Sequence, residues 1–375
     1  MCLTPVQKST AQTVSHLTKD REELWIDILS NVCSTGFVRW DGQGIGVDDG
    51  ALPGLQRIGF VRSIRAPQFD GITFHEVLCK SALNKVPDAS ELPFRFTVNG
   101  YRGCSHACRY CFARPTHEYL DFDSGDDFDT QVVVKTNVAA VLRRELSRPS
   151  WTRETVALGT NTDPYQRAEG RYSLMPGIIG ALADSGTPFS ILTKGTLLRR
   201  DLPLIVEAAR AVDVSVAVSL AVGDLELHAD VEPGTPTPRA RLQLIRAIRG
   251  AGLDCHVMVA PVLPLLTDSV EQLDALLGQI AAAGATSATV FGLHLRGSTR
   301  GWFMAWLTRS RPELVREYRQ LYARGAYLPA NYRDSLRERA APLISKYGLT
   351  GDHRSFRTVP ATAQAAVALP EPTLF

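Results

Sequence analysis

The chain has 375 residues, of which 45% are hydrophobic and 21% charged, values that suit one large globular unit or two ordinary ones. Lys and Arg (41) nearly balance Asp and Glu (39), which excludes a histone-like polycation and an acidic tail protein. No apolar run reaches ~18 residues and the start is polar, so we expect a cytoplasmic protein with no membrane span. Seven cysteines, an odd count, indicate reduced thiols rather than a disulfide scaffold.

Residues 1–93 form a mixed segment and are predicted to be an α/β extension. Residues 20–33 have helical spacing of apolar side chains, and residues 40–54 are a loop rich in Gly and Asp. Residues 58–64 and 72–78 alternate in the manner of strands.

Residues 94–310 follow a regular alternation of strand and helix. The predicted strands are 94–98, 155–159, 189–193, 214–220, 256–260 and 288–293, and the predicted helices are 135–146, 174–185, 202–212, 238–251 and 269–283. Such alternation predicts parallel strands joined by right-handed crossovers. The fold class is therefore α/β, a partial six-stranded (β/α)6 barrel with active residues at the carboxyl ends of its strands.

Residues 311–358 are predicted to be a C-terminal helical segment with two helices around Gly325, and residues 359–375 a disordered tail. Between residues 294 and 357 there are thirteen Lys or Arg, twelve of them Arg, against five Asp or Glu. Aromatic residues interleave with these arginines: Trp302, Tyr318, Tyr322, Tyr327 and Tyr332. The pattern fits either a solvated helical face or a surface that binds nucleic acid or a phosphorylated substrate.

Three cysteines are concentrated in eight residues directly after the first strand of the alternation. Cys104, Cys108 and Cys111 have the spacing C-x3-C-x2-C. Thiolates are soft ligands that suit iron–sulfur clusters and zinc. Three of them can hold a cubane cluster and leave its fourth iron open, whereas zinc needs a fourth ligand, for which His106 or His117 is a candidate. Cys33, Cys79 and Cys255 lie in apolar patterns and are expected in the core.

The cysteine motif resembles the signature of radical S-adenosylmethionine (SAM) enzymes, and the resemblance extends along the chain. The matching segments are Tyr101-Arg-Gly-Cys, Tyr110-Cys-Phe-Ala-Arg, Gly159-Thr-Asn-Thr-Asp-Pro-Tyr-Gln, Thr193-Lys194 and Glu232-Pro-Gly-Thr-Pro. Together they resemble the spore photoproduct lyase-like branch of that superfamily, and Phe74-His-Glu-Val resembles an actinobacterial subgroup of it.

The resemblance implies a cofactor set and a reaction. Cys104, Cys108 and Cys111 would ligate a [4Fe–4S] cluster, and SAM would chelate the open iron. An electron from the cluster, supplied by a donor such as a flavodoxin or ferredoxin, would cleave SAM. The 5′-deoxyadenosyl radical would then abstract hydrogen from a substrate, for which nucleic acid is one candidate.

The resemblance also implies supporting residues at the strand ends. Lys194 would pair with the SAM carboxylate, and Asn161 and Asp163 would lie near the methionyl amine. Ser219 would lie near the ribose, and Tyr110 would act beside the cluster. Arg241 would pair with Glu232 or with the cofactor. Ordinary structural explanations also exist for three of these, namely a surface lysine, an Asx-turn and a small strand residue.

Two departures from the lyases indicate a different substrate. The lyases carry a hydrogen-donating cysteine after the second strand, where this chain has Gly159-Thr-Asn-Thr. They also carry a second tyrosine after the last cluster cysteine, where this chain has Phe112. The radical reaction is therefore expected to act on something other than spore photoproduct. The alternatives are a non-enzymatic iron–sulfur protein for electron transfer or redox sensing, and a zinc-containing nucleic-acid-binding module.

Overall fold

The computed structural model describes residues 58–87, 92 and 94–351. The helix predicted at 20–33, the loop at 40–54, Cys33 and the tail at 359–375 lie outside the described residues. The boundaries predicted after residues 93, 310 and 358 stay predictions.

All six strands predicted for the barrel are present within three residues of their expected ends. They are β4 (Phe96–Val98), β7 (Val156–Leu158), β8 (Phe189–Thr193), β9 (Val214–Ser219), β10 (Cys255–Val262) and β11 (Ser287–Gly292). They pair in parallel in the order β11-β10-β9-β8-β7-β4, and β3 (Leu83–Lys85) adds antiparallel to the β4 edge. Because each strand pairs with the next one along the chain, the carboxyl ends of all six meet at one edge, as in a partial barrel.

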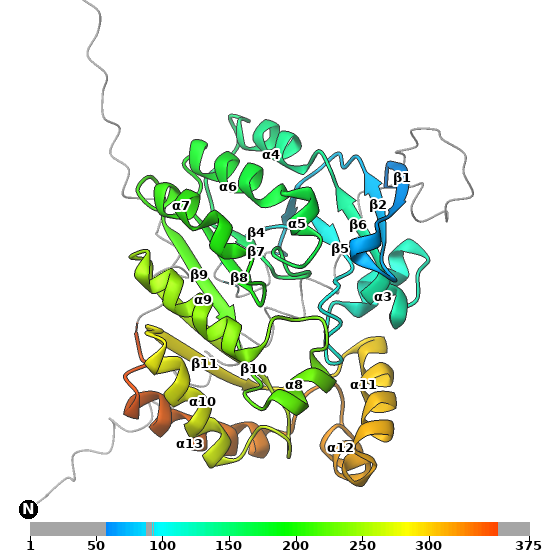
Figure 1. Ribbon diagram of the computed structural model, residues 1–375, viewed down its shortest axis with the longest axis vertical. Coiled ribbons are helices and arrows are strands. Elements are labelled where there is room, and N and C mark those ends of the chain that lie inside the picture. Colours follow the sequence, from blue (N-terminus) through cyan, green and yellow to red (C-terminus); the bar gives the residue numbers. More distant parts are fainter. Residues whose placement is uncertain (1–57, 88–91, 93, 352–375) are drawn as a thin grey trace, which may run out of the picture.

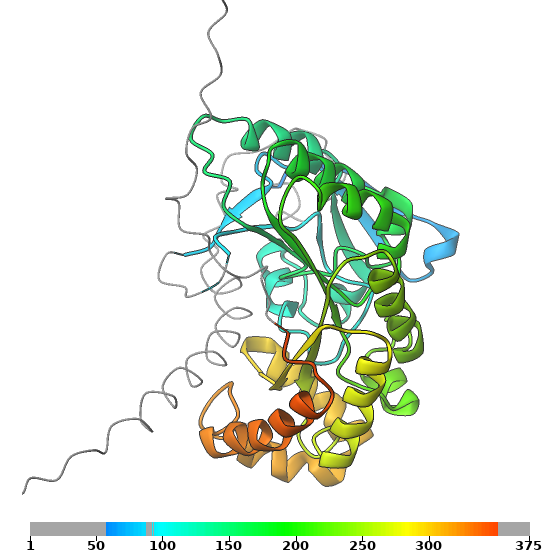
Figure 2. The ribbon, with the colours of Figure 1, turned by 90° about the vertical axis from the view of Figure 1, so that its left-hand side faces the viewer.

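Amphipathic helices cover the outer face of this sheet. They are α4 (Val138–Leu146), α6 (Leu174–Asp184), α7 (Leu198–Ala208), α9 (Pro238–Gly250) and α10 (Val270–Ala282), stacked along one side (Figure 2). Thr237 caps α9, and Ser269 forms a capping box with Gln272 at the start of α10. The main core lies between these helices and the strands and includes Cys79 and Cys255, as expected.

A second, four-stranded sheet lies beside the barrel (Figure 1). It has the order β1-β2-β6-β5, with β1 (Phe60–Arg65), β2 (Thr73–Val77), β6 (Gln131–Lys135) and β5 (Tyr101–Arg102). The sequence predicted β1 and β2 but missed β6, whose Val132, Val133 and Val134 are completely buried. A short apolar run has no periodicity that separates a strand from the start of a helix.

The chain returns to the cysteine loop through short irregular elements. A 3-10 segment (Arg114–Leu120) and α3 (Asp126–Thr130) connect the cysteines to β6. Two further short helices, α5 (Glu169–Tyr172) and α8 (Leu225–Val231), follow β7 and β9.

Three helices close the C-terminal side. They are α11 (Gly297–Ser310), α12 (Val315–Leu321) and α13 (Ala330–Lys346), of which the sequence predicted the last two. Their side chains form a second core with Tyr110 and Cys108. Tyr318 and Tyr322 belong to it and are 0% and 1% exposed, with hydroxyls donated to the carbonyl oxygens of Pro264 and Leu293. These two tyrosines therefore offer no exposed ring to a base.

Within the described residues, every helix is too short or too polar to cross a membrane.

His117 gives a prediction about stability and pH. Its ring is fully buried, stacks on Phe122 at 5.2 Å and donates from Nε2 to the carbonyl oxygen of Gln131 at 2.8 Å. Burial lowers its pKa from 6.5 to about 4. The folded state therefore favours the neutral ring, so this contribution is complete above the unfolded value and is lost as pH falls toward 4.

We expect the free energy of unfolding to fall by up to about 1.4 kcal/mol per pH unit in that window because of His117. Urea unfolding of the wild type and of His117→Gln across the window measures it. Equal pH slopes for the two proteins would contradict the prediction.

Candidate active site

A cavity opens at the carboxyl edge of the parallel sheet. About 1000 Å³ of it is free of protein atoms, including the part open to solvent. Side chains from the loop after β5 and from the ends of β7 to β11 line it: Cys104, His106, Cys108, Tyr110, Cys111, Phe112, Asn161, Asp163, Lys194, Ser219, Met258, Phe291, His294 and Arg296.

The three cysteines lie in a loop without regular secondary structure. Gly103 begins it at φ +77°, where a Cβ would crowd the carbonyl oxygen of Gln131. Cys104 and Cys108 are buried and Cys111 is half-buried. The amide of Cys104 donates to Phe128, and the amide of Cys111 donates back to Cys108.

Distant segments satisfy the remaining backbone groups of this loop. Gln166, completely buried, accepts from the amide of Ser105 and donates to the carbonyl oxygen of Gly103, both at 3.0 Å. The end of α8 and the residues after it bond to the loop at two points. The amide of Arg109 donates to the carbonyl oxygen of Val231, and the amide of Gly234 donates to that of His106. A side chain at Gly234 would collide with the carbonyl oxygen of Ser105.

Arg114 fixes the same loop from within. Its guanidinium is 0% exposed and donates to the carbonyl oxygen of Cys108 at 3.0 and 3.2 Å and to that of Gly125 at 2.7 Å. Its Nη2 also contacts both carboxylate oxygens of Asp129, at 2.8 and 2.9 Å. Burial raises the pKa of Asp129 to about 6, although Arg114 acts in the opposite direction.

The thiols fit a multi-iron cluster by donor type and placement. Burial raises the pKa of Cys108 well above its ordinary value and that of Cys111 to about 11, so both depend on a positive partner to ionise. Among the described residues, no group of three or more His, Cys, Asp or Glu side chains is arranged to hold a metal ion. The three thiols line one cavity, and thiolates are donors that suit an iron–sulfur cluster.

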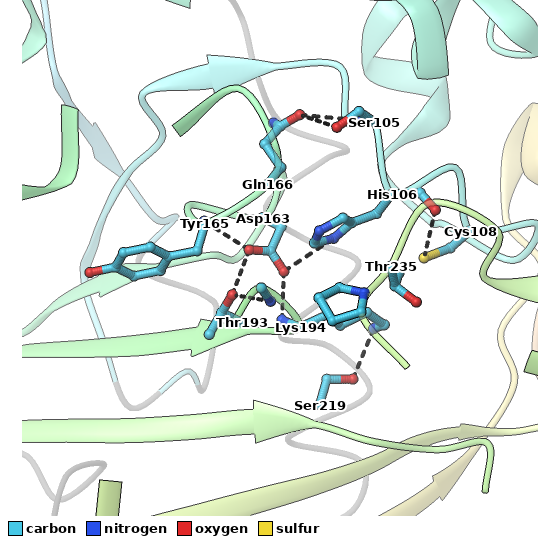
Figure 3. Close-up of polar contacts among 12 residues, drawn as sticks. Ser105, His106, Cys108, Asp163, Tyr165, Gln166, Thr193, Lys194, Ser219 and Thr235 are labelled. Carbon is cyan, nitrogen blue, oxygen red and sulfur yellow. Dashed lines mark hydrogen bonds and ion pairs between the residues drawn. The ribbon is translucent and has the colours of Figure 1, made fainter. Parts of the chain in front are cut away.

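Asp163 connects the loop after β7 to the cysteine loop and to β8 (Figure 3). Its carboxylate accepts from Thr193 Oγ1 at 2.6 Å, from Lys194 N at 2.6 Å and from Tyr165 N at 2.9 Å. His106 Nδ1 lies 3.4 Å from it. Burial would raise the pKa of Asp163, but His106 and the hydrogen bonds lower it to about 2. The carboxylate therefore stays ionised and is occupied by the protein itself.

Lys194 reaches across the cavity wall to β9. Its Nζ donates to Ser219 Oγ at 2.8 Å and lies 5.7 Å from the centre of the Tyr110 ring. The lysine is thus a cation inside the cavity wall and not a surface residue. Ser219 and Asn161 line the same cavity.

Tyr110, Glu232 and Arg241 form a buried group behind this wall. The Tyr110 hydroxyl donates to Glu232 Oε1, and Arg241 Nη2 donates to Glu232 Oε2. Arg241 also donates to the carbonyl oxygen of Ser219 at 2.9 Å. Burial would raise the pKa of Glu232, but Arg241 and Lys194 lower it to about 2. Of the two partners that the sequence left open for Arg241, the structure shows an ion pair with Glu232.

The structure brings most of the predicted site residues together. One cavity is lined by the three cysteines and by Tyr110, Asn161, Asp163, Lys194 and Ser219. Arg241 lies behind it and bonds to the carbonyl oxygen of Ser219. The cavity is also lined by His294 and Arg296, which were not predicted as site residues; Arg296 belongs to the arginine-rich stretch 294–357. His294 directly follows a predicted strand, so the strand-end rule could have identified it.

Comparisons with known proteins agree with this geometry. The family model described as the Radical SAM superfamily matches residues 98–277. The uncharacterized protein Rv2578c of Mycobacterium tuberculosis is 78% identical over 343 residues, covering 90% of this chain and 100% of that protein.

Solved structures share the fold. A point mutant of spore photoproduct lyase has a TM-score of 0.56 at 15% identity, covering 85% of this chain and 88% of that one. Spore photoproduct lyase complexed with dinucleoside spore photoproduct has a TM-score of 0.55 at 14% identity, covering 81% and 85%.

Arg114 gives the prediction from this geometry. Arg114→Met leaves Asp129 buried without its partner and removes two bonds from Cys108 O, so we expect a loss of about 3–5 kcal/mol in unfolding free energy. Iron bound after reconstitution should fall as well. Arg109→Met is the matched control, because Arg109 contacts the same Trp302 ring from a half-buried position. Equal losses of unfolding free energy, measured with urea, and of bound iron in both variants would refute this role of Arg114 in holding the cysteine loop.

Proposed function

This chain belongs to the radical SAM superfamily, and we propose that it is an enzyme that cleaves SAM reductively and abstracts hydrogen from a substrate in the cavity described above. The observation that carries the proposal is the placement of Cys104, Cys108 and Cys111 in one cavity with polar side chains from the strand ends. When bound, a [4Fe–4S] cluster and SAM would supply a one-electron reduction, fed by an external electron donor, that splits SAM and allows a hydrogen atom to be taken from a substrate.

The residues of the chain divide the remaining work. The three cysteines hold the cluster. Lys194 presents its ammonium group to the SAM carboxylate, and Ser219, which accepts from Nζ, fixes the direction of that side chain. Asp163 holds the backbone of Lys194 and the ring of His106, so it positions both the cation and the cysteine loop.

Asn161 offers the cavity an amide that suits a polar group of SAM. Arg241 acts through its bond to the carbonyl oxygen of Ser219, because its guanidinium is buried with Glu232. It therefore positions the end of β9, and its predicted contact with the cofactor would be indirect.

Apolar side chains form another part of the cavity wall, and they limit the number of hydrogen donors near a radical. They are Phe112, Leu192, Met258, Phe291 and Leu293. Tyr110 also lines the cavity, together with the hydroxyl-bearing Thr193 and Ser219. Burial and the adjacent Glu232 raise the pKa of Tyr110 well above the ordinary value, so the hydroxyl keeps its proton.

The substrate we propose differs from spore photoproduct. Among the described residues that line the cavity, the thiols are those of Cys104, Cys108 and Cys111, and the loop after β7 contributes Gly159 and Asn161 instead of a cysteine. A Cβ at Gly159 would collide with the carbonyl oxygen of Leu192, so that position accepts no side chain without a shift of the backbone.

Anaerobic reconstitution tests the proposal. With iron, sulfide, SAM and dithionite, we expect 5′-deoxyadenosine, quantified by chromatography, and no increase when DNA containing spore photoproduct is added. Replacing Cys104, Cys108 and Cys111 with Ala should abolish the product, whereas Cys255→Ala, in the core away from the cavity, should retain it. An intact cluster that binds no SAM and gives no product would favour the electron-carrier alternative.

Tyr110→Phe tests the role of the hydroxyl. In heavy water the Tyr110 hydroxyl carries deuterium, so hydrogen transfer from it places deuterium in 5′-deoxyadenosine, measured by mass spectrometry. We expect the label to drop in Tyr110→Phe and the unfolding free energy to fall by about 1.5–3 kcal/mol, as for a bond to a charged group.

The matched control is Tyr101→Phe, which removes a buried hydroxyl that donates to Glu169 at 2.5 Å outside the cavity. It should lose similar stability and keep the label. Unchanged label in Tyr110→Phe would restrict Tyr110 to a structural role.

A further inference from the structure

The cavity has a second functional wall at the end of β11. Phe291, Leu293, His294 and Arg296 line it there, and a smaller recess adjoins it. The recess shares Phe291, Leu293 and His294 with the main cavity and adds Arg333 and Arg337 from α13. This wall therefore combines residues from β11, from the loop before α11 and from α13.

His294 is the centre of this wall. Its ring lies 4.9 Å from the ring of Tyr327 and 6.0 Å from that of Phe291. Its Nδ1 is buried and has no hydrogen-bond partner among the described residues, and the same is true of Nε of Arg333. Two neighbouring buried polar atoms without partners call for a ligand or an ordered water.

The charges around His294 are positive. The guanidinium of Arg296 lies over the Tyr327 ring at 4.8 Å. Burial, together with the smaller effect of the charges of Arg296 and Arg333, lowers the pKa of His294 to about 3. Two acidic groups on and near α13 have other partners: Asp334 pairs with Arg337 at 2.9 Å, and Asp268 pairs with Arg339 and accepts from Tyr332.

The rest of the basic run is arranged differently. Arg316 and Arg319 on α12 are exposed, and the tyrosines between and after them are buried. Those arginines form an ordinary solvated face. Arg296 instead lines the main cavity with the ring of Tyr327 beside it, and Arg333 lines the adjoining recess. Guanidinium groups next to an aromatic ring are suited to an anion joined to a flat group.

We propose that His294, Arg296 and Arg333 bind a phosphate group, and that the substrate of this enzyme is a nucleotide, either free or within a strand. Phosphate offers several acceptor oxygens to two guanidinium groups and an imidazole at once. The ring of Phe291, which lines both the main cavity and the recess, provides a flat surface for a base. This inference rests on the proposed function, because the wall belongs to the same cavity.

The experiment measures binding and needs no turnover. Thymidine, thymidine 5′-monophosphate and single-stranded oligothymidylate are titrated calorimetrically into the cluster-loaded protein with SAM present and no reductant. A pyrimidine probe avoids competition with the adenine of SAM. We expect the monophosphate or the strand to bind at least about tenfold more tightly than thymidine, in line with charge-assisted hydrogen bonds. Added salt should reduce that difference.

The double variant Arg296→Gln/Arg333→Gln should remove the preference for phosphate, and the matched double variant Arg316→Gln/Arg319→Gln should keep it. A preference shown by the monophosphate identifies a free nucleotide, and one shown by the strand alone identifies a strand. Equal binding of thymidine and both phosphate probes by the wild type would overturn the proposal, even if the first variant failed to fold. Equal losses in the two double variants would overturn it as well. A SAM titration on the same samples separates this failure from that of the proposed function.

Discussion

The structure depends on one constraint: a loop that must present three thiols to a cavity cannot satisfy its backbone in a sheet or a helix. Buried peptide groups need partners, so other parts of the chain must supply them. Gln166 does so from the loop after β7, the segment from Val231 to Gly234 from the end of α8, and Arg114 from the element that follows the cysteines. The barrel, the second sheet and the connecting helices therefore meet at this loop.

A similar logic governs the charges near the cavity. Glu232 is buried and Asp163 is half-buried, yet both stay ionised, because His106 and the amide of Lys194 hold Asp163 and Arg241 holds Glu232. Lys194 connects the two groups, with its backbone on Asp163 and its Nζ on Ser219. Removing any one charge leaves another without its partner in a region of low dielectric, so these residues form a unit that is preorganised before a ligand enters.

The sequence predicted the features that have a clear period or spacing. The six barrel strands follow from alternation, and the position of the cavity follows from their parallel order. Cysteine spacing indicated the thiol loop. What it missed depends on tertiary contacts: β6 is an apolar run whose pairing with β2 cannot be read locally, and α11 lies within a run that composition marks only as basic. Tyr318 and Tyr322 look like surface aromatics in the sequence but bury their rings and bond to carbonyl oxygens.

The wide separation of the residues that hold the cysteine loop has a consequence for biogenesis. Ser105 and Gln166 are 61 positions apart, and Tyr110 and Glu232 are 122 apart. During synthesis, the cysteines leave the ribosome long before the segments that clamp them. Contacts of such long range form late in folding. The contacts that hold the thiol loop are therefore complete only after β9 and α8 have been made, and we expect iron to be bound stably only from that point on.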